Sequence, residues 1–111
     1  MSEPSIQNFH AHIYYDAEQV DRAKALGAAA QAKFGVPVGH FHLVPVGPHP
    51  RGSCQLTIET AQLSEVLPWL VLNRGKFTVF THAQTGNALK DHTDHVIWLG
   101  PSETLKLDQF R

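Results

Sequence analysis

Histidine is the residue type whose number and spacing in this sequence point most directly to chemistry. The chain of 111 residues contains eight histidines, nearly as many as its nine lysines and arginines together, and no consecutive run that would indicate a purification tag. A neutral imidazole binds zinc, copper or iron, and the ring also exchanges a proton near neutral pH. The histidines therefore predict a metal site or a proton-transfer site, provided that the fold gathers them.

Four segments with a period of two are the strands that would position these side chains. The predicted strands cover residues 9–15, 40–45, 53–59 and 77–82. In the first strand, alternation places His10, His12 and Tyr14 on one face. The corresponding face of the other three strands carries His40, His42, Thr57, Glu59, Phe80 and His82. Five histidines are therefore predicted to share one face of a sheet.

Two helical patterns lie between these strands. Asp16 followed by Gln19 resembles a capping box, and apolar residues then recur at helical spacing until the Gly-Val-Pro segment 35–37 ends the pattern. A second apolar stripe follows Ser64, which can cap it, and ends at the Arg-Gly pair 74–75. Both helices have one apolar side and can pack on the sheet.

The order strand, helix, strand, strand, helix, strand is that of the ferredoxin-like sandwich, an α+β fold with an antiparallel sheet and both helices on one face. With the strands numbered along the chain, we expect the spatial order 4-1-3-2. Residues 83–95 are predicted to form a polar loop, and residues 96–99 to add a short C-terminal edge strand. The length of the chain is that of one ordinary domain, which we assign to residues 1–111.

His10, His12 and His82 are the leading candidates for metal ligands. The predicted order makes the first and fourth strands neighbours, so His82 can meet either earlier histidine across the pair. His42 is two strand positions away from the first strand and is a further ligand or a substrate contact. Glu59, the only carboxylate on this face, is either a ligand or a solvated strand end. A single strand histidine is more often a surface residue than a ligand, so the prediction depends on the clustering.

The other histidines have weaker patterns. His49 lies between two prolines, which makes it either a rigid turn residue or a well-positioned proton donor or acceptor. His40 begins a predicted strand and is interpreted as structural or exposed. His92 and His95 have helical spacing next to two aspartates, which fits hydrogen-bonding partners around a site or an exposed polar loop. Cys54 faces the helix layer and is predicted to pack there instead of acting as a nucleophile.

Charge and composition argue against several classes of partner. The formal net charge is -1, from nine basic and ten acidic residues, so no broad positive field would hold nucleic acid or an anionic membrane. One cysteine allows neither an internal disulfide nor a cysteine-only metal site. Residues 1–8 lack the features of a signal peptide, and the longest apolar run, residues 69–72, is too short to span a bilayer. We therefore expect a cytoplasmic protein that binds a small ligand.

Several segments of the chain resemble the DOPA 4,5-dioxygenase family. They are residues 9–15, 42–50 and 69–75, His82 with residues 85–86, and residues 91–92 with 98–100. The resemblance covers nearly the whole chain, and its most specific part is Pro-Val-Gly-Pro-His-Pro at residues 45–50. It implies a ferredoxin-like fold, usually dimeric, and in fungal members an extradiol opening of the catechol ring of DOPA. Many bacterial members have no established substrate, so the reaction class carries over better than DOPA itself.

The resemblance also implies a role for each candidate residue. A ferrous ion, which zinc can replace on the same imidazoles, would be held by His10, His12 and His82, with dioxygen as the co-substrate. The implied catalytic candidates are His49 and His42. The implied contacts to a small catechol-type substrate are Tyr14, His42 and His92.

Two other functions fit the same histidines: a non-catalytic protein that binds a small aromatic ligand, and a metal-buffering protein. Metal content and catechol turnover would separate them. Tyr14, Val44 and Phe80 make the histidine-bearing face too apolar to remain in water. A homodimer that covers this face, or that extends the sheet through residues 96–99, is therefore expected.

Overall fold

Strands and helices alternate along the chain, and the computed structural model describes residues 5–111. In chain order the elements are β1 (Asn8–Tyr14), α1 (Val20–Phe34), β2 (Ser53–Glu59), α2 (Leu63–Asn73), β3 (Thr78–Gln84), α3 (Ala88–Thr93) and β4 (Val96–Leu99). Short 3-10 turns lie at Ala17–Gln19, Thr60–Gln62 and Asp108–Phe110. The strand order in the sheet is β2-β1-β3-β4, and every neighbouring pair is antiparallel.

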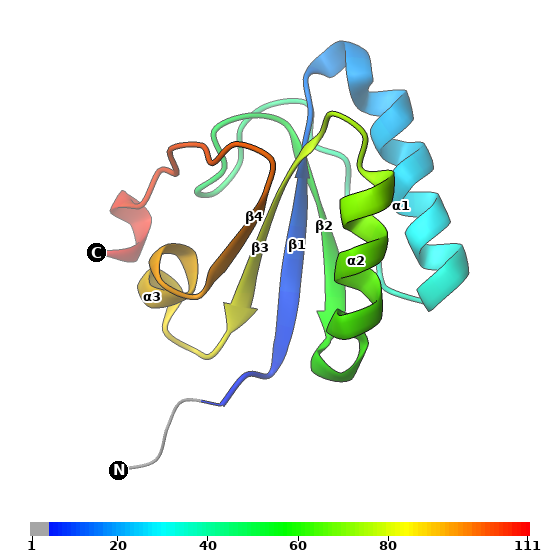
Figure 1. Cartoon of the computed structure of the whole chain (residues 1–111). Coiled ribbons are helices and arrows are strands. Elements are labelled where there is room, and N and C mark those ends of the chain that lie inside the picture. The colour runs from blue at the N-terminus through cyan, green and yellow to red at the C-terminus, as the bar shows by residue number, and fades with distance from the viewer. Residues whose placement is uncertain (1–4) are drawn as a thin grey trace.

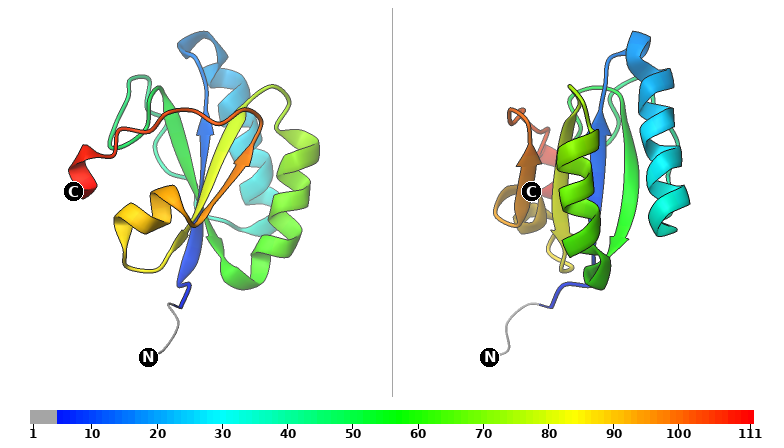
Figure 2. Two further views of the ribbon diagram at one scale, coloured as in Figure 1. Left: turned by 60° about the vertical axis from the view of Figure 1, so that its left-hand side comes forward. Right: turned by 45° about the vertical axis from the view of Figure 1, so that its right-hand side comes forward.

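The sheet separates two layers of the molecule. Helices α1 and α2 pack on one side of it, whereas α3 and the C-terminal segment lie on the other (Figure 1). The side view in Figure 2 shows the same separation. The predicted α+β fold, an antiparallel sheet with two main helices on one face, is therefore confirmed. β1 is a central strand, so residues from both β2 and β3 can meet its side chains.

Alternation along β1 separates core residues from histidines, as predicted. Four residues of this segment belong to the hydrophobic core beneath α1 and α2: Phe9, Ala11, Ile13 and Tyr15. His10, His12 and Tyr14 alternate with them and therefore lie on the other face. A slip of one residue would exchange the two sets, so the burial of the core residues also determines where the histidines point.

The predicted strand at residues 40–45 is wrong. In this part of the described chain, residues 37–42 make three backbone hydrogen bonds with β2, but they form no strand and pair with it only as an isolated bridge between Val38 and Leu56. Leu43 and Val44 lie in a bend and are 59% and 64% exposed, so they do not alternate between a core face and an open face. The glycine and proline residues of this region favour turns over a regular ladder. The sheet therefore ends at β2 on this side and gains the predicted edge strand β4 on the other.

The irregular segment that follows α1 packs closely against that helix because the helix has a glycine, Gly27, at the contact. A Cβ atom at Gly27 would lie 3.0 Å from Cζ of Phe41 and 3.2 Å from Cγ1 of Val38. The missing side chain lets α1 approach residues 38–41 closely. The segment that carries His40 and His42 is thereby fixed without being a strand.

The segment 83–95 was predicted as a loop, but it contains the short helix α3. The Asn87 side chain caps this helix by accepting a hydrogen bond from the Lys90 N–H (3.1 Å). The buried Asp91 carboxylate accepts hydrogen bonds from the N–H and hydroxyl of Thr85 (2.8 and 2.7 Å) and from Nδ1 of His95 (2.8 Å). Burial alone would raise the pKa of Asp91, but these hydrogen bonds outweigh it and lower the pKa. Asp91 therefore holds α3 in place as a carboxylate.

The two long helices begin at capping contacts. Before α1, the Asp16 N–H donates to Oε1 of Gln19 (3.0 Å), as predicted. Before α2, the Glu59 N–H donates to Oε1 of Gln62 (3.3 Å), so Ser64 lies within the helix and not at its cap. Among residues 5–111, no helix combines the length and the apolar character needed to cross a membrane.

Cys54 is expected to resist modification in the folded protein. Its side chain is 1% exposed, and burial raises the pKa of the thiol to about 12. Because the thiolate is the reactive form, a disulfide reagent at pH 8 should react at less than about one tenth of the rate seen in denaturant. The absorbance of the released thiol, followed with and without guanidinium, measures this. A fast stoichiometric reaction of the native protein would contradict the predicted packing role.

Candidate metal centre

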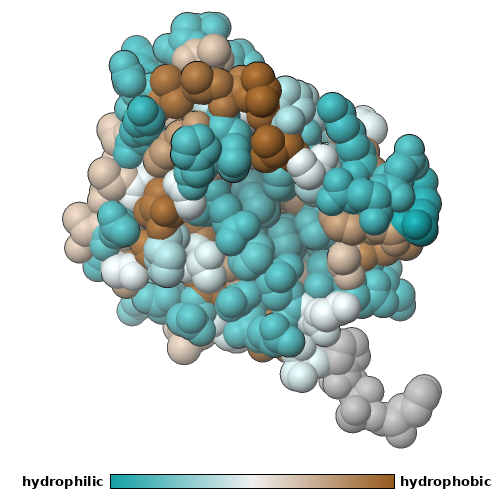
Figure 3. Space-filling view, turned by 180° about the vertical axis from the view of Figure 1, so that it is seen from behind, coloured by the Kyte–Doolittle hydropathy of each residue, from teal (hydrophilic) through white to brown (hydrophobic). Residues whose placement is uncertain are grey.

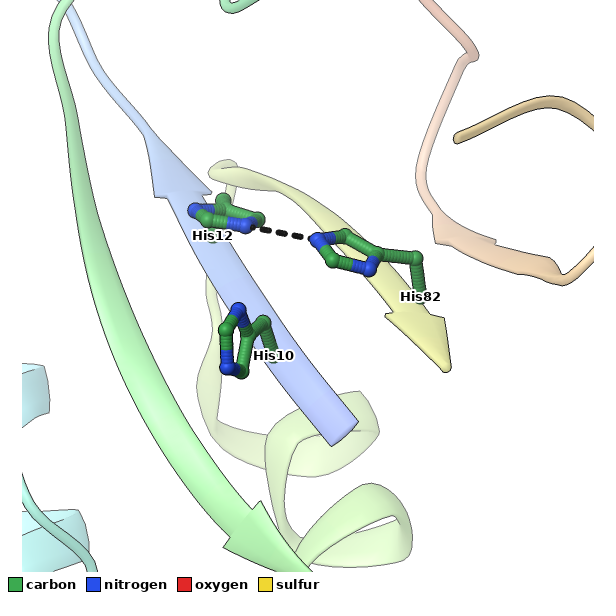
Figure 4. Close-up of side chains that lie close together, drawn as sticks. All are labelled: His10, His12 and His82. Carbon is green, nitrogen blue, oxygen red and sulfur yellow. Dashed lines mark hydrogen bonds between the residues drawn. The ribbon is translucent and has the colours of Figure 1, made fainter. Parts of the chain in front are cut away.

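Three histidines from the central strands form a close group on the sheet face away from α1 and α2. His10 lies directly across from His82 in the register of β1 and β3, and His12, two residues further along β1, lies across from Phe80. The ring nitrogens that the three residues offer lie within 4.8 Å of one another. Figure 4 shows His10 and His12 on β1, and His82 on β3 beside them. Alternation and strand adjacency, the two steps of the prediction, are both present.

The contact between His12 and His82 indicates how this group would receive a metal ion. Their Nε2 atoms are 3.1 Å apart. Nδ1 of His82 lies 3.0 Å from the carbonyl oxygen of Ala83. Because that oxygen can only accept a hydrogen bond, Nδ1 carries the proton of the neutral ring and Nε2 keeps its lone pair. Metal-binding histidines are commonly held by such a bond from their second nitrogen.

Burial keeps these rings in the form that binds metal. His12 and His82 are 5% and 2% exposed. Desolvation lowers the pKa of His12 well below its usual range, and the nearby rings of His49 and His82 lower it further. Desolvation likewise lowers the pKa of His82 to about 4 and also lowers the pKa of His10. The three imidazoles are therefore neutral at pH 7 and offer lone pairs.

The donor set fits a transition-metal ion. Two nitrogens bound at right angles to one ion, each about 2.1 Å from it, are about 3 Å apart. The separation of 3.1 Å between the Nε2 atoms of His12 and His82 is close to this value. Glu59, which was considered as a further ligand, lies at the exposed end of β2 opposite Asn8. Within residues 5–111 no carboxylate joins the three histidines, so their set leaves positions open for other ligands.

A fourth histidine, His49, packs against the group. Its ring centroid lies 4.1 Å from that of His12, and its Nδ1 is 2.7 Å from the hydroxyl oxygen of Tyr14. Burial raises the pKa of the Tyr14 phenol, which keeps its proton. This contact serves either tautomer of the ring: the hydroxyl donates to a bare Nδ1, or its oxygen accepts from Nδ1–H. In both tautomers Nδ1 is occupied by Tyr14, so Nε2 of His49 is the nitrogen left for a ligand.

Contacts from two distant segments hold the loop that carries His49. The Lys106 N–H donates to the carbonyl oxygen of Pro48 (2.8 Å). The Arg51 guanidinium binds both carboxylate oxygens of Glu103 (3.1 and 2.9 Å) and one of Asp16 (3.1 Å). A forked contact of this kind restrains orientation as well as distance. The loop is thereby tied to the C-terminal segment and to the start of the first helical region.

The helix α3 adds a fifth ring to this side of the sheet. The ring centroid of His92 lies 4.2 Å from that of His82, and Phe110 stacks on His92 at 4.5 Å. Nδ1 of His92 is bonded to the carbonyl oxygen of Ala88 (2.7 Å), which leaves Nε2 without a partner among residues 5–111. His92 is therefore placed to meet a ligand beside His82.

A cavity of about 410 Å³ opens beside the three-histidine group, between β2 and residues 37–49. His12 and His49 are the most buried histidines of its wall, whereas His42 is half-buried and His40 is exposed, toward the mouth. In the view from behind, hydrophilic side chains occupy the centre of the visible face and a hydrophobic band lies above them (Figure 3). The volume is within the range of small-molecule sites.

A larger hollow of about 530 Å³ lies between α1 and α2, but its wall contains no histidine and no carboxylate. Its polar lining residues include Arg22, Asn73, Arg74 and Lys76. Of the two, the smaller cavity is the candidate site, because its wall contains His12 and His49, whose pKa values are lowered by burial.

The structure places the remaining site predictions as follows. His42 lies on the cavity wall and outside the three-histidine group. Tyr14, predicted to contact the substrate, is fully buried with its hydroxyl on His49. His40, interpreted as structural or exposed, lines the same cavity as His42. The signal that could have identified His40 is its spacing of two from His42.

Phe110, which stacks on His92, was not predicted, and no periodicity in its segment indicates it.

Fold and site together define a small α+β protein with a histidine-rich centre on the sheet face away from its two long helices. The family model described as the Dopa 4,5-dioxygenase family matches residues 9–109. The chain therefore belongs to this family.

Similar proteins come from fungi and a cyanobacterium. A DOPA 4,5-dioxygenase from Amanita muscaria is 31% identical over 95% of this chain and 50% of its own length. An uncharacterized protein from Botryotinia fuckeliana is 34% identical over 90% of this chain and 60% of its own length. A crystal structure from Nostoc punctiforme, provisionally named a dioxygenase, has a TM-score of 0.89 and 38% identity over 93% of this chain and 90% of that one. The chain thus spans only about half the length of the Amanita relative.

Proposed function

We propose that this protein is an extradiol dioxygenase that opens the ring of DOPA or a related small catechol at a ferrous ion. The main support is the group of His10, His12 and His82 beside a small-molecule cavity in a member of the Dopa 4,5-dioxygenase family. In this reaction both atoms of dioxygen enter the product. One ring carbon–carbon bond next to a hydroxylated carbon breaks, and its ends become a carboxylate and an aldehyde.

The three histidines would hold the ferrous ion through ring nitrogens. When bound, iron supplies the one-electron chemistry that lets ground-state dioxygen react with a catechol. Zinc binds the same imidazoles but has no redox chemistry, so a zinc-loaded sample should be inactive.

His49 is the proposed acid and base of the reaction. A catechol hydroxyl must lose a proton on binding, and an oxygen atom must gain one when the ring opens. Nε2 of His49 can accept the first proton in the tautomer whose Nδ1–H donates to the Tyr14 oxygen, and the ring that is then protonated can return a proton from Nε2. His42 on the cavity wall and His92 beside His82 are the proposed substrate contacts.

The test is turnover by protein that has been loaded with ferrous iron in the absence of air. On addition of air and DOPA or methylcatechol, we expect one dioxygen consumed per catechol and a new visible absorbance from the ring-opened product. An oxygen electrode and mass spectrometry measure this, and the first product should have the summed mass of catechol and dioxygen.

Zinc-loaded protein is the matched control and should bind the catechol without consuming dioxygen. Dioxygen uptake with a quinone as the product would contradict ring cleavage. Tight catechol binding by the iron-loaded protein without dioxygen uptake would favour a non-catalytic binding protein.

We also propose that this single domain works as a homodimer in the cytoplasm. β4 is an edge strand, and such a strand can pair with a second copy. The other reason for a dimer, exposure of the histidine-bearing face, is weaker than expected. Tyr14 and Phe80 on this face are already fully buried by the chain itself.

A further inference from the structure

The wall of the cavity beside the metal centre lacks charged side chains. Its lining, which lies within the described residues, contains neither aspartate or glutamate nor lysine or arginine. An ammonium group that entered this cavity would find no carboxylate to pair with. Removing a charged group from water without a partner is costly, so this absence bears on which substrates can enter.

Several backbone acceptors in this wall already accept a hydrogen bond from the protein itself. The carbonyl oxygens that accept a hydrogen bond from elsewhere in the protein include those of Pro37, Gly39, Val46, Pro48, Ser53 and Gln55. The hydroxyl of Thr57 accepts a hydrogen bond from the side chain of Gln55 (3.1 Å). The acceptors left for the N–H groups of a ligand, such as the amide oxygen of Gln55, are neutral, and none of them is a carboxylate.

Donors, in contrast, are available at the mouth of the cavity. The rings of His40 and His42 lie 4.8 Å apart at an angle of 73°. Their nitrogens have no hydrogen-bond partner within residues 5–111, whereas Nδ1 of His92 and Nδ1 of His95 do. A histidine ring carries at least one N–H whether it is neutral or protonated. Two neighbouring rings can therefore donate to the two oxygens of one carboxylate.

We propose that this cavity selects catechols whose side chain carries a carboxylate and no ammonium group, and that His40 and His42 bind that carboxylate. This inference rests on the proposed ring-cleaving function and names its substrate class. The ring would lie toward His12 and His49, and the acidic side chain would extend toward the mouth. Dihydroxyphenyl alkanoates belong to this class. DOPA carries both a carboxylate and an ammonium group and is a poorer match. Dopamine carries only the ammonium group, which is unfavourable in this cavity.

Four catechols with different side chains test this selectivity: dihydrocaffeate, DOPA, dopamine and methylcatechol. With iron-loaded protein, kcat/KM for dihydrocaffeate should exceed that for methylcatechol about tenfold, as for one charge-assisted contact. DOPA should lie between the two, and dopamine should be the poorest substrate. Calorimetry in the absence of dioxygen should give the same order of affinities and does not depend on turnover.

The variant His40→Gln/His42→Gln tests the residue assignment. The ratio of the affinities for dihydrocaffeate and methylcatechol should fall from about ten to about one. His95→Gln is the matched control, since it changes a histidine outside the cavity in the same way, and it should keep the ratio of the parent protein.

The outcomes separate this inference from the proposed function. If no catechol is cleaved but calorimetry gives the expected order, the ring-cleaving function is wrong and the selectivity stands. If dopamine binds or reacts as well as dihydrocaffeate, or if none of the four binds, the selectivity is overturned. If the double variant keeps the full preference for dihydrocaffeate, the assignment to His40 and His42 is overturned.

Discussion

Replacing either His12 or His82 with alanine is expected to abolish stoichiometric metal binding. Both rings are buried, their Nε2 atoms are 3.1 Å apart, and each supplies one of three nitrogens in the candidate site. Loss of a hydrogen-bonding partner around a metal typically costs about 10- to 100-fold in affinity, so loss of a ligand should cost at least about 100-fold. Each variant is loaded with ferrous iron without air, dialysed, and compared with the parent by elemental analysis.

Two controls keep this experiment interpretable. His40→Ala removes an exposed histidine outside the three-histidine group and should retain the full metal content. Because alanine leaves a cavity at a buried site, His82→Gln serves as a better-filled variant, and circular dichroism checks the fold of each protein. Full occupancy in both His12→Ala and His82→Ala would eliminate this site and return the two histidines to a structural role.

The strands could be predicted from the sequence where one face of the strand packs on the hydrophobic core, because burial then requires strict alternation of apolar and polar residues. Ala11 and Ile13 must face the helices, so His10 and His12 must face away from them. Residues 40–45 alternate in the same way, yet no helix covers Leu43 and Val44, and the pattern there does not produce a strand. The existence of α3 depends on the cap and the buried carboxylate described above, and six residues are too few for a periodic signal.

For the candidate site too, the features that follow from local sequence patterns could be predicted, whereas those that depend on long-range contacts could not. The three-histidine group follows from alternation and from the adjacency of two strands, both of which a sequence can indicate. The bond between Tyr14 and His49 joins residues 35 positions apart, and one partner lies in an irregular loop. Phe110 reaches His92 only because the C-terminal segment returns across the sheet face. Such contacts depend on the path of loops, for which no periodicity exists.

His49→Gln is expected to lower kcat by about 100-fold or more while leaving the metal content unchanged. The reason is that His49 lies beside the metal centre without being part of the three-histidine group. Steady-state rates on methylcatechol, with iron measured in the same samples, give both quantities. A variant that loses its iron would mean that His49 is a ligand, and the division between metal binding and proton transfer would be wrong.

Tyr14→Phe should lower kcat about tenfold, with little change in KM or metal content, because Tyr14 acts only through His49. The Tyr14 side chain is completely buried, and its hydroxyl has the Nδ1 atom of His49 as its partner in the described chain. Without this bond the ring loses the partner that orients it and stabilises Nδ1 in either tautomer, but no contact to substrate disappears. The double variant Tyr14→Phe/His49→Gln makes the test strict, since residues that act as a unit have non-additive effects. Its kcat should equal that of His49→Gln alone. A further tenfold loss in the double variant would mean that Tyr14 acts on the reaction independently of His49.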